Sequence, residues 1–330
     1  MQIVVDLSRL RHNIRIIRSR LSGGFCAVIK ANAYGHGTAV APYVEPVVDC
    51  FMVATYHEAE EALLSGVNKP ILVMGGELPT VKPDSRIIPA VSTARDAEAM
   101  IRAGINFSVA VDTGMNRLGA TAAELKEIAA VCDSYGAVPW SVYSHVYNGM
   151  SSAGEQAQKL SDLTYDIPIF KARRHIYCSC ALDLPQNERF DMTRCGIAMY
   201  GFAQGLETAL KARAKIVRIA RVSHGSHVGY GDFILERDAT VATVRMGYAD
   251  GLRRTEMPLY LKVRGVKCPV LGMPCMDLTM IDISGVPARV GEFAYMIADK
   301  ADVEYLAKAY NTIVYEVLTG LNGRAERIYM

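Results

Sequence analysis

The chain has 330 residues, in which 36 lysines and arginines are balanced by 34 aspartates and glutamates. This near-neutral balance gives no strong field for nucleic acid or an acidic membrane surface, so the expected partner is a small molecule. The N-terminus lacks a signal-peptide pattern, and no segment reaches the roughly 18 apolar residues of a membrane span. The sequence therefore predicts a cytoplasmic protein with one large and one smaller domain.

Short apolar runs recur through residue 201, and a longer amphipathic stretch follows each run. Continuous apolar runs indicate strands that are buried on both faces, as in a parallel sheet covered by helices. Eight such units favour a closed (β/α)8 barrel, or TIM barrel, over an open sheet. The candidate strands are FCAVIKA (25–31), CFMVAT (50–55), PILVMG (70–75), IIPAV (87–91), FSVAVDTG (107–114), WSVYSHV (140–146), HIYCSC (175–180) and CGIAMYG (195–201).

After residue 205 the pattern changes to shorter strand-like segments separated by glycine and proline. This predicts a barrel domain over residues 1–205 and a β-rich domain over residues 206–330. The opening strand, within residues 1–7, is a candidate to pair with the β-rich domain. The strand-like segments are AKIVRIARV, ATVATVRM, LYLKVRG, CPVLG and TMIDIS, and a helix follows in VEYLAKAYNTIVYEVLTGL, ending at Gly320 or Gly323.

Eight cysteines are scattered along the chain, and several lie in β-branched or aromatic runs. This placement is typical of buried thiols and does not indicate a disulfide framework. Cys178 and Cys180 alternate along a predicted strand but have no matching Cys or His pair, so no metal site is predicted.

Polar residues fall at the predicted C-terminal strand ends, where a barrel of this type places its active site. A lysine that ends a buried strand is costly unless it is paired or chemically used. Desolvation lowers an amine's pKa, and an uncharged amine can form an imine with an aldehyde cofactor. Taken alone, a lysine extending out of the barrel rim remains the alternative. The strand-end residues are Lys30, Asp112, Arg117, His145, Ser179, Arg194 and Gly196.

Longer motifs surround these residues. The segments AVIKANAYGHG, VDTGMNRLG, CGIAMYG, VGYG, MGYADG and MPCMDLT, in this order, resemble those of the alanine racemases across nearly the whole chain. The resemblance implies a fold-type III enzyme that uses pyridoxal 5'-phosphate to interconvert L- and D-alanine and supplies D-alanine for peptidoglycan. It also implies an N-terminal barrel, a C-terminal β domain and a homodimer with shared active sites.

By this resemblance, the catalytic residues are Lys30, which would carry the cofactor as an internal aldimine, and Tyr230, which would reach in from the second subunit. One group would remove the Cα proton and the other would return it from the opposite face, so the configuration inverts. A free phenol has a pKa of about 10, so positive neighbours are required, and His145 and Arg194 are the proposed ones. Taken alone, a tyrosine between two glycines is a strand-end turn.

The resemblance also assigns the cofactor's phosphate to Tyr34, Ser179 and the backbone amides of Gly196 and Ile197. This assignment agrees with the tendency of barrels to bind phosphate after strands seven and eight. Small residues and unpaired N–H groups are what a dianion requires.

Arg194 would face the pyridine nitrogen of the cofactor. Because a guanidinium only donates hydrogen bonds, that nitrogen would stay unprotonated, and a weaker electron sink limits side reactions. The alternative is a surface pairing of Arg194 with Asp191. For the substrate, Arg117 and the backbone of Met276 would contact the carboxylate, and Tyr248 would line the entryway.

Four positions depart from the family pattern. The residues after His145 read VYNGMSS, and the position of a common acidic residue falls near Met150. Ala110 stands where relatives commonly have a lysine that orients the arginine, and Cys178 replaces a common asparagine. Gly323 stands where relatives often have a tyrosine near the cofactor. Loss of that phenol opens room for a hydroxymethyl group, so a serine or broad-specificity racemase remains an alternative.

Two alternatives come from other functional classes. A non-catalytic pyridoxal-phosphate-binding protein would keep the lysine, but it needs neither the β-rich domain nor an opposed tyrosine. A basic amino-acid decarboxylase shares the two-domain layout. Decarboxylation benefits from an acidic partner for the pyridine nitrogen, and Arg194 does not fit that requirement.

Overall fold

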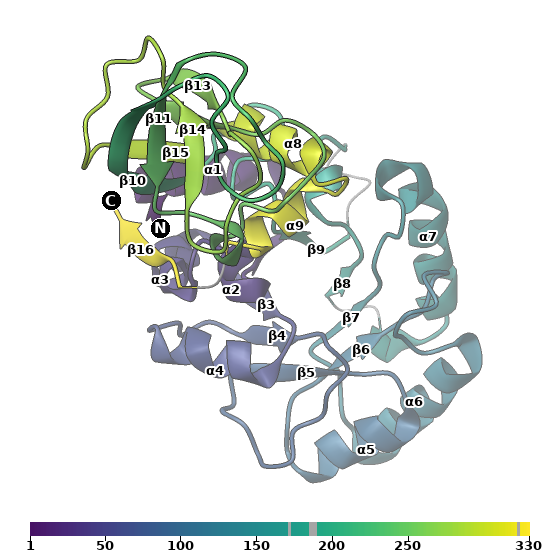
Figure 1. The fold of residues 1–330 in the computed structure, drawn as a ribbon. Coiled ribbons are helices and arrows are strands. Elements are labelled where there is room, and N and C mark those ends of the chain that lie inside the picture. Colours follow the sequence, from purple (N-terminus) through teal and green to yellow (C-terminus); the bar gives the residue numbers. More distant parts are fainter. Residues whose placement is uncertain (171–172, 185–189, 322–323) are drawn as a thin grey trace. The chain divides into compact units, whose positions relative to one another are not determined.

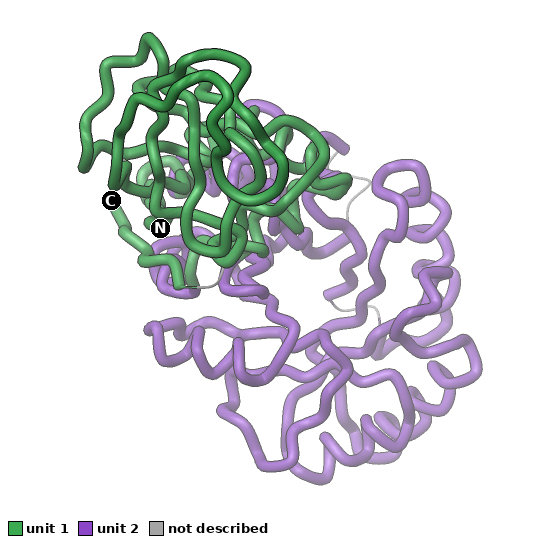
Figure 2. The backbone as a smooth tube through the Cα atoms, in the orientation of Figure 1, with its two compact units in different colours: residues 1–10, 34–37, 207–330 green, residues 11–33, 38–206 purple. Residues whose placement is uncertain are grey.

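The computed structural model describes residues 1–170, 173–184, 190–321 and 324–330. The chain divides into two compact units, which Figure 2 distinguishes by colour. The first, here called the barrel unit, comprises residues 11–33 and 38–206. The second, here called the C-terminal unit, comprises residues 1–10, 34–37 and 207–330.

Eight parallel strands form the centre of the barrel unit (Figure 1), in the order β8, β7, β6, β5, β4, β3, β2, β9. Backbone hydrogen bonds from Asp191 to Arg174 and from Arg194 to Tyr177, both 3.0 Å long, connect β9 to the chain around β8. The sheet is thus nearly closed, and the predicted (β/α)8 barrel is confirmed. The strands span Gly24–Val28 (β2), Cys50–Val53 (β3), Ile71–Val73 (β4), Ile87–Val91 (β5), Ser108–Ala110 (β6), Ser141–Tyr143 (β7), Arg174–His175 (β8) and Met192–Cys195 (β9).

Helices cover the outside of this sheet. Two of them begin with capping boxes, in which Thr55 pairs with Glu58 and Thr121 pairs with Glu124. The expected alternation of strand and helix fails between β4 and β5, because the described residues 74–86 contain no helix. The helices are α1 (Leu7–Arg20), α3 (Ala41–Val44), α4 (Tyr56–Leu64), α5 (Ala94–Arg102), α6 (Ala122–Tyr135) and α7 (Gly149–Thr164), with short 3-10 helices at Thr38–Val40, Glu45–Val47, Pro168–Phe170 and Ser179–Ala181.

The predicted strand at residues 195–201 is wrong. The strand is β9, which ends at Cys195, and the chain then folds into turns with hydrogen bonds from Met199 to Gly196 and from Gly201 to Ala198, both 2.9 Å long. Residues 195–201 are nonetheless all buried. An apolar composition reports burial, and here it could not distinguish a buried strand from a buried turn.

Strands dominate the C-terminal unit, as predicted for this part of the fold. They run in the order β13, β12, β15, β10, β1, β16, and β11 joins β10 to β14. The opening strand β1 lies antiparallel to β10 and parallel to β16. The strands span Gln2–Val5 (β1), Leu210–Val222 (β10), Ala239–Val244 (β11), Tyr260–Val263 (β12), Val266–Pro269 (β13), Thr279–Asp282 (β14), Phe293–Ile297 (β15) and Glu326–Tyr329 (β16).

The single helix predicted from residue 303 to residue 320 or 323 is also wrong. Two helices are present, α8 (Lys300–Ala309) and α9 (Val314–Thr319). Asn311, at φ 51°, takes the left-handed conformation between them and interrupts the helical hydrogen bonds. The possible end at Gly323 lies outside the described residues. None of the helices in the described ranges combines the length and apolarity that a membrane span requires.

Candidate active site

Lys30 lies just beyond the C-terminal end of β2, in a turn assigned as α2 (Lys30–Tyr34). Residues 31–33 have φ values between 51° and 53°, a left-handed conformation that costs roughly 1–2 kcal/mol per residue. Glu58 holds this turn: its Oε1 accepts from the Ala31 amide at 2.7 Å, and its Oε2 accepts from the Ala54 amide at 2.7 Å. The start of α4 therefore fixes the backbone from which Lys30 projects.

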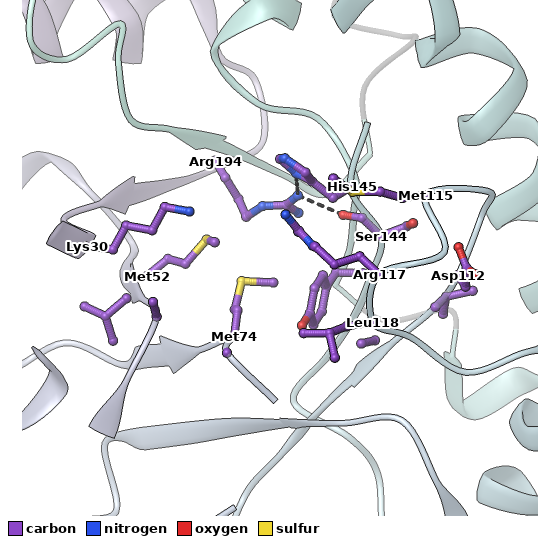
Figure 3. A pocket seen from close by; sticks show the side chains of 16 residues that line it. Lys30, Met52, Met74, Asp112, Met115, Arg117, Leu118, Ser144, His145 and Arg194 are labelled. Atoms are coloured by element: carbon purple, nitrogen blue, oxygen red, sulfur yellow. Dashed lines mark hydrogen bonds between the residues drawn. The ribbon is translucent and has the colours of Figure 1, made fainter. Parts of the chain in front are cut away.

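A cavity of about 260 Å³ lies at this end of the barrel. Figure 3 shows the nitrogen-bearing ends of Lys30, Arg117 and Arg194 directed into it from the turn after β2, the loop after β6 and strand β9. The predicted strand-end residues Lys30, Arg117, His145 and Arg194 thus meet in one place. The lining also includes Met52, Val53, Ala54, Met74, Gly75, Ala110, Val111, Asp112, Met115, Leu118, Tyr143 and Ser144.

The surroundings of Lys30 favour its uncharged form. Burial, followed by the positive charges of Arg117 and Arg194, lowers the pKa of Lys30, and the carboxylate of Glu58 partly offsets this effect. A larger uncharged fraction makes the amine more nucleophilic toward an aldehyde at neutral pH.

Arg194 is buried inside the barrel and 2% exposed. Its Nη1 donates to Nδ1 of His175 at 2.6 Å. Its Nη2 donates to the Ser144 carbonyl at 2.8 Å and to Nδ1 of His145 at 3.0 Å. The Nε–H group has no acceptor among the described residues. The alternative pairing of Arg194 with Asp191 is wrong, because the carboxylate of Asp191 accepts from the backbone amide of Arg174 instead.

Both histidines that accept from Arg194 are neutral. Burial, then the charges of Arg194, Arg117 and Lys30, lowers the pKa of His145 to about 3. Burial and Arg194 lower the pKa of His175 well below its usual value. His145 is therefore not the positive neighbour that the sequence suggested. Because an arginine only donates, each histidine carries its proton on Nε2, so His145 offers an N–H group instead of a charge.

His175 continues the network into the barrel and was not predicted as a site residue. Its Nε2 lies 3.0 Å from Oγ of Ser141, which donates to Oγ of Ser108 at 2.8 Å. The Tyr143 ring stacks on the His175 ring with centroids 5.3 Å apart. The segment HIYCSC indicated a strand, and nothing in the sequence paired its histidine with an arginine 19 residues later.

Arg117 projects from the loop after β6 and makes no hydrogen bond or ion pair with another described residue. Asp112 orders that loop, since its Oδ1 accepts from the amides of Gly114 at 2.9 Å and Asn116 at 3.1 Å. Ala110, where the family pattern has a lysine, is buried and packs with Tyr143. Within the described chain no side chain takes over the lysine's role of orienting Arg117.

Ser179 does not end a strand, because β8 stops at His175 and Ser179 begins a 3-10 helix. Its Oγ accepts from the amides of Gly196 at 3.1 Å and Ala198 at 3.3 Å. These hydrogen bonds hold the hydroxyl against the chain after β9, with buried Ile197 between the two amides. Ala198 is an addition to the predicted set.

The other predicted residues belong to the C-terminal unit. Tyr34 is buried there, with its ring 5.9 Å from that of Tyr315. Tyr230, Tyr248 and Met276 are instead 64%, 42% and 52% exposed. Nothing in this unit places them beside Lys30, which belongs to the barrel unit.

Backbone contacts gather these three exposed residues on neighbouring loops. Tyr230 forms an isolated bridge with Met273. The Tyr248 amide donates to the Cys275 carbonyl at 3.0 Å, and the next amide, that of Ala249, donates to the Met276 carbonyl at 3.1 Å. Large apolar groups exposed together on a surface mark a site of interaction. This surface, here called the tyrosine surface, includes Tyr230, Phe233, Ile234, Tyr248, Met273, Met276 and Leu278.

Sequence comparisons match both units to domains of the same family. Family models for the alanine racemase N-terminal and C-terminal domains match residues 5–204 and 209–329. An alanine racemase of Desulfosudis oleivorans is 31% identical over 375 residues, which cover 98% of this chain and 95% of the relative. One of Aquifex aeolicus is 30% identical over 342 residues, covering 98% of this chain and 97% of the relative.

Solved structures agree with these matches. An alanine racemase of Clostridium difficile 630 superposes with a TM-score of 0.90 at 28% identity, covering 100% of this chain and 95% of that one. The alanine racemase of Bartonella henselae, solved with covalently bound pyridoxal phosphate, gives a TM-score of 0.87 at 27% identity and covers 100% of this chain and 99% of its own.

Proposed function

The chain belongs to the alanine racemase family and is a racemase, and we propose that it interconverts L- and D-alanine with pyridoxal phosphate as its cofactor. The observation that carries this proposal is the amine of Lys30, held in a cavity with Arg117 and Arg194 and with a lowered pKa. D-Alanine formed in this way would be available for peptidoglycan.

Residues that line the cavity, together with others that follow β8 and β9, are proposed to hold a cofactor with an aldehyde, an aromatic ring nitrogen and a phosphate. Lys30 supplies the amine for the aldehyde. Ser179 and the amides of Gly196 and Ile197 are proposed as donors for the phosphate, and Tyr34 as a further contact. For this role the Gly196 amide, which donates to Ser179 Oγ in the structure, would donate to the phosphate instead. When bound, the cofactor withdraws electrons from the substrate's Cα and makes its proton more acidic.

Arg194 is proposed to meet the ring nitrogen through Nε–H, the one donor that the histidines and carbonyls leave over. His145, His175 and the Ser144 carbonyl hold the guanidinium plane, so this donor has a fixed direction. Because the guanidinium does not give up its proton, the ring nitrogen stays unprotonated and the electron sink stays weak. That weakness favours return of the proton to Cα over competing reactions.

Proton transfer at Cα requires a second group on the face opposite Lys30, and Tyr230 of the partner subunit is proposed for this role. Tyr230 is exposed on the tyrosine surface of its own chain, and a second copy that covers this surface would bury it. The charge of Arg194 and the Nε2–H group of His145 would stabilise its phenolate. Lys30 Nζ and Tyr230 Oη then exchange protons with the two faces of Cα, so the configuration inverts.

The substrate carboxylate is proposed to lie against Arg117 and the backbone of Met276 of the partner subunit, with Tyr248 at the entrance. Arg117 has its donors available for this purpose. The alternative of a serine or broad-specificity racemase rests on Gly323, which lies outside the described residues. The carrier and decarboxylase alternatives find no support in the family matches.

Chiral chromatography tests the reaction and the substrate together. The purified chain is incubated with pyridoxal phosphate and, separately, with L-alanine, L-serine, L-lysine and L-ornithine, and the enantiomers are then quantified. We expect D-alanine to form fastest, and only when the cofactor is present. Faster formation of D-serine would contradict alanine as the preferred substrate, and amine products without D-enantiomers would contradict the racemase proposal.

A further inference from the structure

Two thiols flank the serine of the proposed phosphate site. The Sγ atoms of Cys178 and Cys180 lie 3.2 Å apart, and both residues are half-buried. Ser179 between them accepts hydrogen bonds from the amides of Gly196 and Ala198. The pair therefore lies close enough for direct sulfur chemistry, and it brackets a residue to which we assign a function.

The other six cysteines do not combine proximity with access. Five of them, Cys26, Cys50, Cys132, Cys195 and Cys268, are buried. Cys26 and Cys50 do interact with each other, but both are 0% exposed. Cys275 is half-buried like the pair, and burial raises its pKa. It therefore serves as a matched reference for a partly exposed thiol of low reactivity.

The two thiols of the pair are not equivalent. The hydrogen bond from Cys180, with a smaller contribution from Arg194, lowers the pKa of Cys178. The same contact raises the pKa of Cys180. Because the thiolate is the nucleophile, Cys178 is the attacking sulfur, and Cys180 is positioned to resolve the product.

We propose that Cys178 and Cys180 form a redox-active dithiol that a small-molecule disulfide oxidises reversibly to an intramolecular disulfide. The Cys178 thiolate attacks one sulfur of the reagent, a mixed disulfide forms, and one reagent thiolate leaves and takes a proton from water. Cys180 then loses its proton, its sulfur attacks Cys178 Sγ, and the second reagent thiolate leaves. Two protein thiols are oxidised, and one reagent disulfide is reduced to two thiols.

The geometry favours a labile disulfide over a structural one or a metal site. A bond of about 2.05 Å between residues only two apart closes a small, strained ring, and strained disulfides are readily reduced. No cluster of three or more His, Cys, Asp or Glu residues suited to a metal ion occurs within the described residues. The ring would also pass through Ser179, so oxidation would move its hydroxyl away from the amides of Gly196 and Ala198.

Intact-mass and peptide analysis of the cofactor-free protein in a buffer of oxidised and reduced glutathione tests the dithiol. We expect the wild type and Cys275→Ser to lose two hydrogens without a lasting adduct, and to regain them with excess reduced glutathione. Cys180→Ser should retain glutathione on Cys178, and Cys178→Ser should stay unmodified at position 180. A lasting adduct in the wild type, first reaction at Cys275 or no reaction at either position would overturn the proposal.

The effect on the phosphate site rests on the proposed function and is measured separately. The oxidised wild type should bind pyridoxal phosphate about tenfold more weakly than the reduced protein, because one charge-assisted contact is displaced. Cys178→Ser under the same treatment should show no such change. Equal affinity of the two wild-type forms would overturn the link to Ser179, while the mass result is independent of the racemase activity.

Discussion

Lys30 and Tyr230, the two proposed proton-transfer groups, have different surroundings within their own units. Lys30 is half-buried and its backbone turn is tied to Glu58. Burial, followed by Arg117 and Arg194, lowers its pKa. Tyr230 is 64% exposed on a loop between Gly229 and Gly231, whose φ values are 75° and 88°. One group thus has a prepared environment within the chain, and the other has almost none.

This contrast indicates where the proposed second copy of the chain would act. The charges that would make a phenol useful near neutral pH lie in the barrel unit, around Arg194. The exposed apolar side chains lie around Tyr230, where a covering subunit would remove them from water. Substitutions at the barrel site are therefore expected to reduce activity directly. The contribution of the tyrosine surface to activity is expected to depend on association with a second subunit.

Lys30→Ala should have the largest effect. Without the amine, neither covalent attachment of the cofactor nor one of the two proton transfers is available, so activity should fall by at least about a thousandfold. The measurements are racemisation of L-alanine and the mass of the protein after borohydride reduction with pyridoxal phosphate. Lys126→Ala, which removes an exposed lysine on α6, is the control and should match the wild type. Turnover retained by Lys30→Ala would remove Lys30 from the mechanism.

Tyr230→Phe should keep the cofactor and lower the rate by about a hundredfold to ten-thousandfold, the range for loss of one acid–base group. Loss of solvent-deuterium exchange at Cα should be greater from L-alanine than from D-alanine, because the phenol serves only one face. If deuterium exchange at Cα slowed equally from L-alanine and from D-alanine, the two-base scheme would be contradicted.

Mixing inactive variants tests whether the site is shared between subunits. If Lys30 and Tyr230 come from different chains, a refolded equal mixture of Lys30→Ala and Tyr230→Phe contains mixed dimers with one intact site each. About a quarter of the wild-type activity should then return. A site formed within one chain would give no recovery of activity, and that result would overturn the shared-site proposal. The exposure of Tyr230 would then not be explained by a second subunit that covers it.

The sequence predicted the barrel because each buried parallel strand is a continuous apolar run, which can be recognised from its own residues without knowing which strands pair with it. The same signal failed at residues 195–201, where the amides of Gly196 and Ala198 turn toward Ser179 and end the strand while the residues stay buried. It also failed at Asn311, whose left-handed backbone divides the predicted helix. In both cases a local backbone conformation decided the outcome, and composition did not encode it.

The cavity residues were predicted for a similar reason. Lys30, Arg117, His145 and Arg194 lie at the C-terminal ends of strands or in the segments that follow them, and topology alone brings these ends together. Glu58 and His175 were missed, because each acts through a contact that only the folded chain creates. The capping box of Thr55 and Glu58 is visible in the sequence, but the contact of Glu58 with the Ala31 amide is not.

His175→Leu should destabilise the barrel unit and change the pH dependence of its stability. At pH 7.5 the loss should be about 1–3 kcal/mol, because Arg194 and Ser141 each lose a buried partner. In the wild type the folded-state pKa of His175 lies below its unfolded value, so the unfolded chain binds the extra proton as pH falls below about 6.5. That protonation costs the wild type stability on acidification.

The variant lacks this cost, so its deficit should shrink by about 1.4 kcal/mol between pH 7.5 and 5.5. Urea unfolding of both proteins at the two pH values measures the change. His57→Gln removes a histidine whose side chain is 80% exposed, and it should leave the pH dependence as it is in the wild type. An identical deficit of His175→Leu at both pH values would contradict a neutral, buried His175.

Glu58→Gln should have the smallest effect and should separate positioning from charge. The amide keeps the shape of the side chain but loses the negative charge and one acceptor, which costs about 1–2 kcal/mol of stability. Because the Glu58 carboxylate raises the pKa of Lys30 against burial and the arginines, its removal lowers that pKa further. The pH above which the protein combines with pyridoxal phosphate should therefore move down, as read from the visible absorption band.

Glu60→Gln makes the same charge change on an exposed position of α4 and should leave this transition unmoved. A shift to higher pH in Glu58→Gln would show that Glu58 governs Lys30 through the backbone of the left-handed turn and not through its charge.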